Sequence, residues 1–534
     1  MNGMALSLNL ATNKNIKMKK SIYLVFLSVI TTFYPLQPIN AQQFPNIVFV
    51  FADDMGYGDV SGLNPFARTK TPAIDKLVGN GITFTEAHAS ASVCTPSRYG
   101  LLTGRYAFRS KDAANGIGGF TKPVIEKESE TLASVLKKAG YTTACIGKWH
   151  LGVGWQTKDG NQPRMNEITG YSNVDFSKKV TGGPNDYGFD YSFIHPASLD
   201  IPPYLFLRNH QSVDADMILT TDYYPNRKES TVYAWDKKHS NEQAVYWEKG
   251  VWWRQGEMSR SFRVEDCFSE IVKEGVAFID KQAAENREKP FFLYLPLTGP
   301  HTPWMPSEQF KGKSSAGVYG DFIFDIDDAV AQIKNALIQN GIAENTMLIF
   351  SSDNGAYWPQ EEVELFAHNS NQGRKGQKGD VWDGGHRVPL VISWPAKIKE
   401  AATCNQLVSL TDFFVTFCEL TGQKPKANQG DDSFSFLHVL NGDTEKVIRE
   451  SMVHHSASGF YGIRMGDWKF IDGLGSGGFS SPMKLIPDEK GPKGQLYNIK
   501  KDALESQNLY FQNPKKVTEL SKMMKEIVEK GHSN

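Results

Sequence analysis

Residues 46–54 of this 534-residue chain read Asn46-Ile47-Val48-Phe49-Val50-Phe51-Ala52-Asp53-Asp54. After its first position the run is apolar up to the aspartates, and it is rich in β-branched and aromatic side chains. Such a run is typical of a strand that is buried on both faces of a parallel sheet. The aspartates follow at the carboxyl end of the strand, where open α/β sheets bind their ligands. Because adjacent carboxylates repel each other, the pair predicts a shared cation, with a surface turn as the alternative.

Similar apolar runs predict further strands of the same sheet at Tyr141–Ile146, Phe291–Leu295 and Thr346–Ser351. Amphipathic patterns predict helices at Glu130–Gly140, Glu265–Ala283 and Phe322–Asn340. Strands that alternate with helices indicate an α/β domain with a mostly parallel sheet sandwiched by helices. Polar candidates for a site follow these strands, namely Lys148, His150, His301, Asp353 and Asn354.

A second stretch indicates reactive chemistry: Ser92-Val93-Cys94-Thr95-Pro96-Ser97-Arg98-Tyr99-Gly100-Leu101-Leu102-Thr103-Gly104-Arg105. The pattern predicts a loop that enters a helix, with Cys94 at the junction. A thiol at a helix start is favoured as the thiolate by the unpaired N–H groups, and Arg98 lies one turn further on the same face. Cys94 is therefore a candidate nucleophile, and a buried structural cysteine is the alternative.

The spacing Cys-x-Pro-x-Arg followed by Leu-Leu-Thr-Gly-Arg resembles the signature of the type I, formylglycine-dependent sulfatases of the alkaline-phosphatase-like superfamily. The motifs are most similar to the branch that contains arylsulfatase A and N-acetylgalactosamine-6-sulfatase. This resemblance implies a large mixed, mostly parallel sheet with helices on both faces. It also implies a catalytic domain over residues 44–425 and a smaller carboxyl-terminal antiparallel sheet-plus-helix subdomain over residues 426–534.

The resemblance further implies that a maturation enzyme converts Cys94 to formylglycine. One Ca²⁺ ion per chain would be bound by Asp53, Asp54, Asp353, Asn354 and the side chain at position 94. Apart from position 94 these ligands offer only oxygen, which suits a hard cation and argues against zinc. The resemblance also implies that His150 is the base that releases sulfate, and that Arg98 and Lys148 hold the formylglycine hydrate. The implied sulfate ligands are Lys148, Ser198, His301 and Lys378. Of these, His301 and Lys378 would also donate a proton to the leaving oxygen.

The overall charge gives no sign of a nucleic-acid partner or of an anionic membrane surface. The chain has 58 lysine and arginine residues against 59 aspartate and glutamate residues, so an anionic ligand must be recognised locally. Residues 1–43 combine several lysines, the apolar run Ile22–Tyr34 and a cleavage site after Ala41, a pattern that predicts a signal peptide. Translation from Met1 or from Met18 would preserve this pattern. The sequence thus predicts a periplasmic or secreted protein without a membrane anchor.

Two features of the sequence leave alternatives open. Five cysteines at irregular spacings argue against a disulfide scaffold, although Cys404 and Cys418 could either pair or remain separate thiols. Periodicity fades between residues 155 and 265, which is typical of binding loops or lids. The tryptophans of this segment either stack on sugar rings or pack an insertion onto the domain: Trp235, Trp247, Trp252 and Trp253.

The sequence therefore predicts an exported sulfatase that acts on a sulfated carbohydrate of host or dietary glycans. Within that class it favours 6-O-sulfated galactose or N-acetylgalactosamine, on the resemblance alone. A phosphomonoester or phosphonate hydrolase of the same superfamily is the alternative enzyme. A glycan-binding protein with an inactive site is the alternative from another class.

Overall fold

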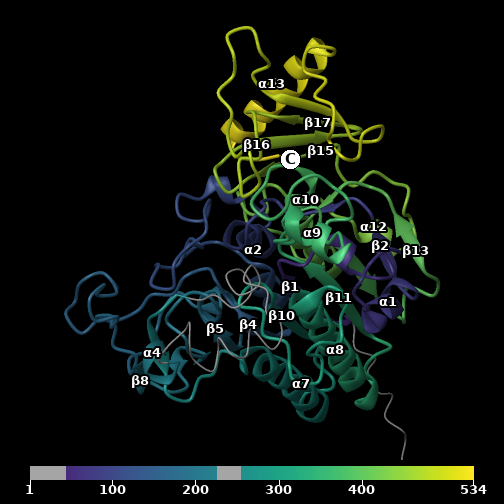
Figure 1. Ribbon diagram of the computed structural model, residues 1–534. Helices are drawn as coiled ribbons and strands as arrows, with labels where there is room; N and C mark the ends of the chain where they lie inside the picture. The colour runs from purple at the N-terminus through teal and green to yellow at the C-terminus, as the bar shows by residue number, and fades with distance from the viewer. Residues whose placement is uncertain (1–43, 225–253, 534) are drawn as a thin grey trace, which may run out of the picture. The chain divides into compact units, whose positions relative to one another are not determined.

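The structure, a computed structural model, describes residues 44–224 and 254–533. A ten-stranded sheet lies at its centre, in the order β13-β2-β12-β11-β1-β10-β4-β5-β6-β7 (Figure 1). Five adjacent strands run parallel, namely β11 (Thr346–Ser352), β1 (Asn46–Asp53), β10 (Phe291–Pro300), β4 (Thr142–Lys148) and β5 (Tyr191–His195). The predicted α/β class with a mostly parallel sheet is therefore confirmed.

Some sequence predictions concern residues outside this description, namely the signal peptide over residues 1–43 and the tryptophans Trp235, Trp247, Trp252 and Trp253. All five cysteines are described, and each is a buried free thiol. Cys404 and Cys418 therefore form no disulfide. Within residues 44–224 and 254–533, no helix has both the length and the apolar character needed to cross a membrane.

Strand β1 is buried on both faces, as its sequence predicts. Ile47, Phe49 and Phe51 are fully buried in one hydrophobic cluster, whereas Val48 and Val50 are fully buried in another. Because successive side chains of a strand point to opposite faces, the sheet separates two cores. This central position fixes the carboxyl end of β1 at the middle of the sheet edge.

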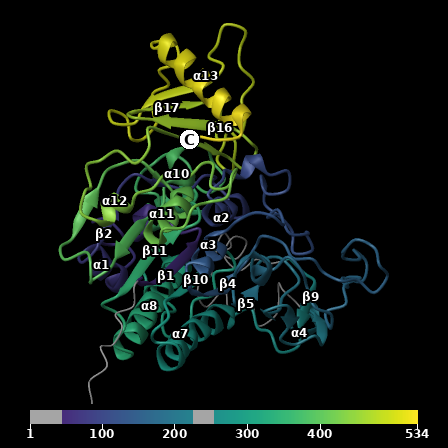
Figure 2. The ribbon, with the colours of Figure 1, turned by 180° about the vertical axis from the view of Figure 1, so that it is seen from behind.

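Helices cover both faces of the sheet. On the side of Val48, α7 (Cys267–Glu285) packs against β10 and β4, and α8 (Gly317–Gln339) packs against α7 and β10. On the side of Phe49, α11 (Phe413–Thr421) packs against α3 (Leu132–Lys138) and α2 (Cys94–Thr103). Figure 2 brings this second set of helices into view.

The sheet becomes mixed toward its two edges. Strand β12 (Leu390–Ser393) is antiparallel to β11 and to β2 (Ile82–Phe84), and β13 (Ala402–Cys404) pairs parallel with β2. At the other edge β6 (Leu207–Arg208) and β7 (Gln211–Ser212) follow β5 in antiparallel order. The sequence predicted no strand in this second region, because strands of two to five residues carry too little periodicity to be detected.

The remaining short elements connect these layers. They are α1 (Pro72–Val78), β3 (Ala87–His88), β8 (Met217–Leu219), α4 (Thr220–Tyr223), β9 (Glu257–Ser259), α9 (Gln360–Phe366), α10 (Asp383–His386), β14 (Val408–Ser409) and α12 (Leu437–Leu440).

The carboxyl-terminal part contains a separate four-stranded antiparallel sheet. Its strands are β15 (Ser451–His455), β16 (Tyr461–Met465), β17 (Trp468–Ile471) and β18 (Gln495–Asn498). Helix α13 (Pro514–Lys530) packs against β16 and β17 and shares a small core with them. A small antiparallel sheet with a helix is thus present, as the family resemblance implied. The boundary at residue 426 stays a prediction.

A buried ionic network joins the small sheet to helix α10 and to the loop that carries Glu505. The Lys469 ammonium group lies 3.0 Å from Asp383, 2.9 Å from Glu505 and 3.1 Å from the His386 ring. The side chains of the lysine and of both acids are fully buried. Burial alone would raise the pKa of Asp383, but the charges of Lys469 and Arg387 hold it well below its usual range. Glu505 therefore depends on the lysine for compensation, whereas Asp383 shares it with Arg387.

We expect Lys469→Met to destabilise the protein by about 3–5 kcal/mol, because it leaves the buried Glu505 without its cation and Asp383 with Arg387 alone. Lys500→Met is the matched control, since Lys500 is 76% exposed and lies 4.0 Å from Asp467. Thermal unfolding followed by circular dichroism compares the two variants with wild type. Equal melting temperatures for Lys469→Met and wild type would show that the network is not needed for stability.

Candidate active site

The residues singled out in the sequence converge at one edge of the large sheet, at the carboxyl ends of its parallel strands. Asp53 ends β1 and Lys148 ends β4, while Asp353 follows β11 and His301 follows β10. Cys94 is the first residue of α2, and all ten residues of this helix are buried. No predicted site residue exceeds the 8% exposure of His301. Their charges therefore act on one another with little screening by water.

The acidic residues and Asn354 form one contiguous group. The Asp54 backbone N–H donates to Asp353 Oδ1 at 3.1 Å, and the Asn354 amide donates to Asp54 Oδ1 at 2.7 Å. Ligand atoms of Asp53, Cys94 and Asp353 all lie within 4.8 Å of one another. The buried atoms Asp53 Oδ1 and Asn354 Oδ1 have no hydrogen-bond partner. Buried acceptor oxygens without donors fit a metal cation at this point.

Three cations from different elements neutralise this group. Lys148 Nζ lies 2.5 Å from Asp53 Oδ2, and Lys378 Nζ lies 2.7 Å from Asp54 Oδ2. Arg98 donates from Nε and Nη2 to Asp353 Oδ2 at 3.0 and 2.8 Å, and its Nη2 also lies 3.3 Å from Asp53 Oδ1. Helix α2, strand β4 and the loop before α10 are thereby tied to the sheet edge.

The pKa values of two acids diverge in this environment. Burial alone would raise the pKa of Asp53, but the charges of Lys148, His301, Arg98 and Lys378 hold it well below its usual range. Burial and the negative charge of Asp53 raise the pKa of Asp353 well above its usual range, despite Arg98. The basic side chains of the site thus do not fully stabilise all of its acids in the ionised form. This favours a bound metal ion.

Cys94 and His150 form a pair on the side of α2. The thiol Sγ lies 3.2 Å from His150 Nδ1, while His150 Nε2 lies 3.0 Å from the carbonyl oxygen of Ile117. Because a carbonyl only accepts, the ring proton belongs on Nε2 and the Nδ1 lone pair faces Cys94. Burial and the charge of Lys148 lower the pKa of His150 to about 3. The imidazole is therefore neutral at neutral pH and able to accept a proton from position 94.

The opposite side of the site carries Ser198 and His301. Lys148 Nζ donates to Ser198 Oγ at 3.0 Å, so the lysine bridges Ser198 and Asp53. His301 Nδ1 donates to the Thr302 carbonyl at 2.6 Å, which leaves Nε2 directed at the site, 3.8 Å from Asp54 Oδ2. The structure therefore brings together every residue that the sequence predicted for this site.

Lys378 reaches the acids of the site, whereas the nearby Lys375 does not. Lys375 Nζ donates to the backbone oxygen of Glu505 at 3.1 Å and lies over the Trp382 ring, away from the acids of the site. Sequence analysis missed Asp200, a buried acid close to the site. Its only local signal is its position two residues after Ser198.

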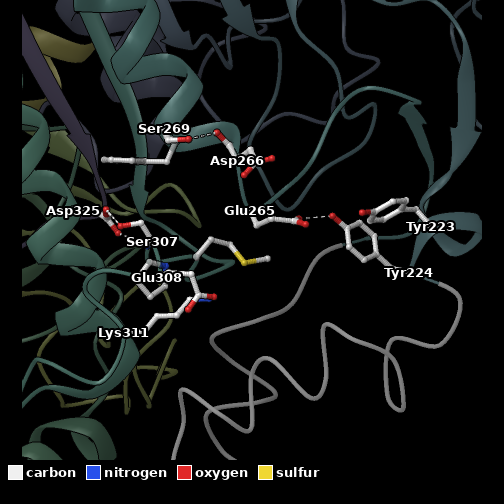
Figure 3. A pocket seen from close by; sticks show the side chains of 12 residues that line it. Tyr223, Tyr224, Glu265, Asp266, Ser269, Ser307, Glu308, Lys311 and Asp325 are labelled. Carbon is white, nitrogen blue, oxygen red and sulfur yellow. Dashed lines mark hydrogen bonds and ion pairs between the residues drawn. The ribbon is translucent and has the colours of Figure 1, made fainter.

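Two other places in the fold have features of a site. His88, Asp383 and His386 could hold a metal by their spacing, but the Lys469 ammonium group already supplies the cation there. A cavity of about 430 Å³ lies apart from the site residues (Figure 3). Its charged lining consists of Glu265, Asp266, Glu308, Lys311 and Asp325. This mainly acidic lining disfavours an anionic ligand.

Comparison with known families decides between the candidate enzyme classes. Residues 45–423 match the family model described as Sulfatase. The chain belongs to the sulfatase family. Residues 377–533 of this sulfatase also match the model described as N-sulphoglucosamine sulphohydrolase, C-terminal. The protein is therefore a sulfuric ester hydrolase.

Relatives of the sulfatase span nearly its whole length. It is 32% identical over 509 residues to N-acetylgalactosamine-6-O-sulfatase of Bacteroides thetaiotaomicron, covering 91% of this chain and 94% of the relative. It is 30% identical to arylsulfatase G of Rattus norvegicus, with coverages of 88% and 83%. A solved structure from work on glycosaminoglycan metabolism by Bacteroides thetaiotaomicron matches with a TM-score of 0.75 and 30% identity, over 91% of this chain and 99% of that one.

The fold itself is shared more widely than the activity. A phosphonate monoester hydrolase of Agrobacterium radiobacter matches the sulfatase with a TM-score of 0.56 at 16% identity, over 91% of this chain and 96% of that one. At this identity the likeness concerns the fold alone. Preference for a sulfate over a phosphonate must therefore come from the residues of the site.

Proposed function

We propose that this sulfatase removes sulfate from a sulfated sugar of a glycan, and that the sugar is 6-O-sulfated N-acetylgalactosamine or galactose. The observation that carries the proposal is the group of buried cations around the acids of the site, Arg98, Lys148 and Lys378. The choice of sugar is supported by relatives that are named as N-acetylgalactosamine-6-sulfatases in Bacteroides thetaiotaomicron and Mus musculus. Export through the predicted signal peptide would bring the enzyme to such glycans.

A calcium ion fits the proposed site. Asp53, Asp54, Asp353 and Asn354 would hold it beside the side chain at position 94, because they offer oxygen ligands and two of these oxygens lack donors. When bound, the ion supplies Lewis-acid polarisation of the sulfuryl oxygens. Cys94, once oxidised to formylglycine by a maturation enzyme, supplies a hydrated aldehyde as the nucleophilic group.

The chain's own residues bind the ester and move protons. His150 Nδ1 is placed to take a proton from the side chain at position 94, 3.2 Å away. Arg98 and Lys148 orient that side chain together with its acidic neighbours. Lys378 and Ser198 donate to the sulfate oxygens, so the negative charge is held by fixed donors in a site with little water. His301, as the imidazolium with Nδ1–H held by the Thr302 carbonyl, would donate its Nε2 proton to the departing sugar oxygen and become neutral, with Lys378 as a second donor.

The calcium proposal predicts a metal response that depends on Asp353. A ligand at about 100 times its Kd stabilises a protein by about 2.7 kcal/mol, so saturating Ca²⁺ should raise the melting temperature of chelator-treated wild type. Asp353→Asn should lose most of this rise, because one charged ligand is gone.

Asp216→Asn serves as the control for this measurement, because the side chain of Asp216 is 58% exposed and pairs with Arg260 at the surface. It should keep the full response to Ca²⁺. A larger stabilisation by Zn²⁺ than by Ca²⁺, or an undiminished response in Asp353→Asn, would contradict the assignment.

The formylglycine proposal predicts a mass change at one cysteine. In a host with a maturation enzyme, the peptide that contains Cys94 should be lighter than its unmodified form by about 18 Da, the difference between thiol and aldehyde side chains. Cys145, Cys267, Cys404 and Cys418 are internal controls that should keep their thiols, since they lie outside the signature stretch. An unmodified Cys94 in fully active protein would exclude the conversion.

The same preparation tests the substrate. A panel of sulfated monosaccharides of defined position should show sulfate release from the 6-O-sulfated galactose type, and Cys94→Ala should fold normally and release none. Aryl sulfate should be hydrolysed faster than aryl phosphate, whereas the reverse order would indicate a phosphoryl-transfer enzyme. Fully modified protein that hydrolyses none of these compounds would instead support a glycan-binding function.

The role of His301 predicts a loss that depends on the leaving group. A sugar alkoxide needs a proton in the transition state, whereas nitrophenolate leaves without one, and general acid catalysis contributes ~10²–10⁴-fold. His301→Ala should therefore lose about that factor in kcat on a sulfated sugar and much less on nitrophenyl sulfate. His210→Ala is the control, since His210 pairs with Asp186 near the surface. Equal losses on both substrates would leave His301 with a role in sulfate binding only.

A further inference from the structure

A short turn after β5 carries a second polar group to the edge of the proposed sulfate site. The Ile201 N–H donates to the Ser198 carbonyl at 2.8 Å, and the same carbonyl lies 3.2 Å from the ring of His195, the last residue of β5. The turn is thus fixed to the large sheet. Asp200 lies within it and is 7% exposed.

The Asp200 carboxylate is held rigidly but is only half satisfied. Arg254 Nη1 donates to Asp200 Oδ2 at 2.7 Å, and the backbone N–H of Arg254 donates to the Asp200 carbonyl at 2.9 Å. The other carboxylate oxygen, Oδ1, is buried and has no hydrogen-bond partner. Leaving a charged acceptor buried and unpaired is costly, and within residues 44–224 and 254–533 no donor reaches Oδ1.

The surroundings of Asp200 place it beside the groups proposed to hold the sulfate ester. Burial alone would raise the pKa of Asp200, but the charges of His301, Arg254 and Lys148 hold it below its usual value. Ser198 is its neighbour in the turn, and Lys148 donates to Ser198 at 3.0 Å. Asp200 therefore lies next to the sulfate site on the side of His301, the proposed donor to the sugar oxygen.

The chemistry of a carboxylate limits what it can bind at this position. An ionised carboxylate only accepts hydrogen bonds and repels the sulfate group, so its partner must be a neutral donor. A metal is not required, because Arg254 already pairs with the charge and Asp200 is not among the acids that could share an ion. The hydroxyl or amide N–H groups of a sugar ring are donors of the required kind.

We propose that Asp200 accepts a hydrogen bond from a hydroxyl or amide N–H group of the sulfated sugar and thereby selects which sugar is hydrolysed, with Arg254 as the residue that positions it. This inference rests on the proposed carbohydrate substrate and names a residue that recognises the sugar. It assigns Asp200 to recognition of the sugar, whereas the acids around Cys94 are proposed to act at the sulfuryl group.

The test combines a substitution with changes in the substrate. Asp200→Ala and wild type are assayed on 6-O-sulfated N-acetylgalactosamine, on its monodeoxy and N-deacetylated analogues, and on nitrophenyl sulfate. A hydrogen bond to a charged group is worth about 10- to 10²-fold, so Asp200→Ala should lose that factor in kcat/KM on the parent sugar. Wild type should lose a similar factor on the one analogue that lacks the recognised donor.

The decisive result is that the two losses do not add. On the analogue that lacks the donor, Asp200→Ala should be no slower than wild type, since the contact is already absent. On nitrophenyl sulfate the variant should stay within about 3-fold of wild type, because truncations that touch no part of the substrate cost little. Asp216→Ala, at an exposed ion pair in the same region, should match wild type on every substrate.

Additive losses on every analogue would overturn the proposal. So would a loss for Asp200→Ala on nitrophenyl sulfate equal to its loss on the sugar, because Asp200 would then only support Lys148 or His301. If Asp200→Ala unfolds at a lower temperature than wild type, Asp200→Asn is used for the same comparison, because it keeps the size of the side chain. If wild type hydrolyses nitrophenyl sulfate but no sulfated sugar, the proposed substrate class itself is refuted. This result is distinct from the two outcomes that contradict the role of Asp200.

Discussion

The structure depends on the burial of three carboxylates, Asp53, Asp54 and Asp353, at the middle of one sheet edge. Their mutual repulsion and desolvation must be offset, and the chain offsets them with cations from a helix, a neighbouring strand and a loop: Arg98, Lys148 and Lys378. Three negative charges then face three positive charges. A divalent cation would turn this balance into an excess of positive charge, which attracts an anion into a site with little water.

This electrostatic requirement also explains the arrangement of the chain around the site. Parallel strands end together, so residues far apart in sequence meet there without any strand leaving the sheet. Asp53, Lys148 and Arg98 therefore belong to the rigid sheet and to helix α2. Asp200 belongs instead to a turn that follows the last parallel strand, where sequence can vary without disturbing the acids.

Much of this could be predicted from the sequence because its signals are local. The continuous apolar run of β1 predicted a strand buried on both faces, and the family signature around Cys94 indicated which polar residues meet. Strands β5 to β7 were missed because they are short, and β15 was missed among irregular segments. The bonds of Lys469 and the partner of Asp200 were missed because ion pairs between distant residues leave no periodic trace in the sequence.

The burial of Cys94 sets an order of events during synthesis. Its neighbour Ser92 donates to the carbonyl of His455, 363 residues later in the chain, and accepts from the N–H of Gly379. Segments made late in synthesis therefore cover a cysteine made early, and Cys94 is only 6% exposed in the folded chain. At 5–20 residues per second, the ribosome needs roughly 20–70 s to add those residues. The proposed oxidation of this thiol would therefore have to come before the late segments close over it.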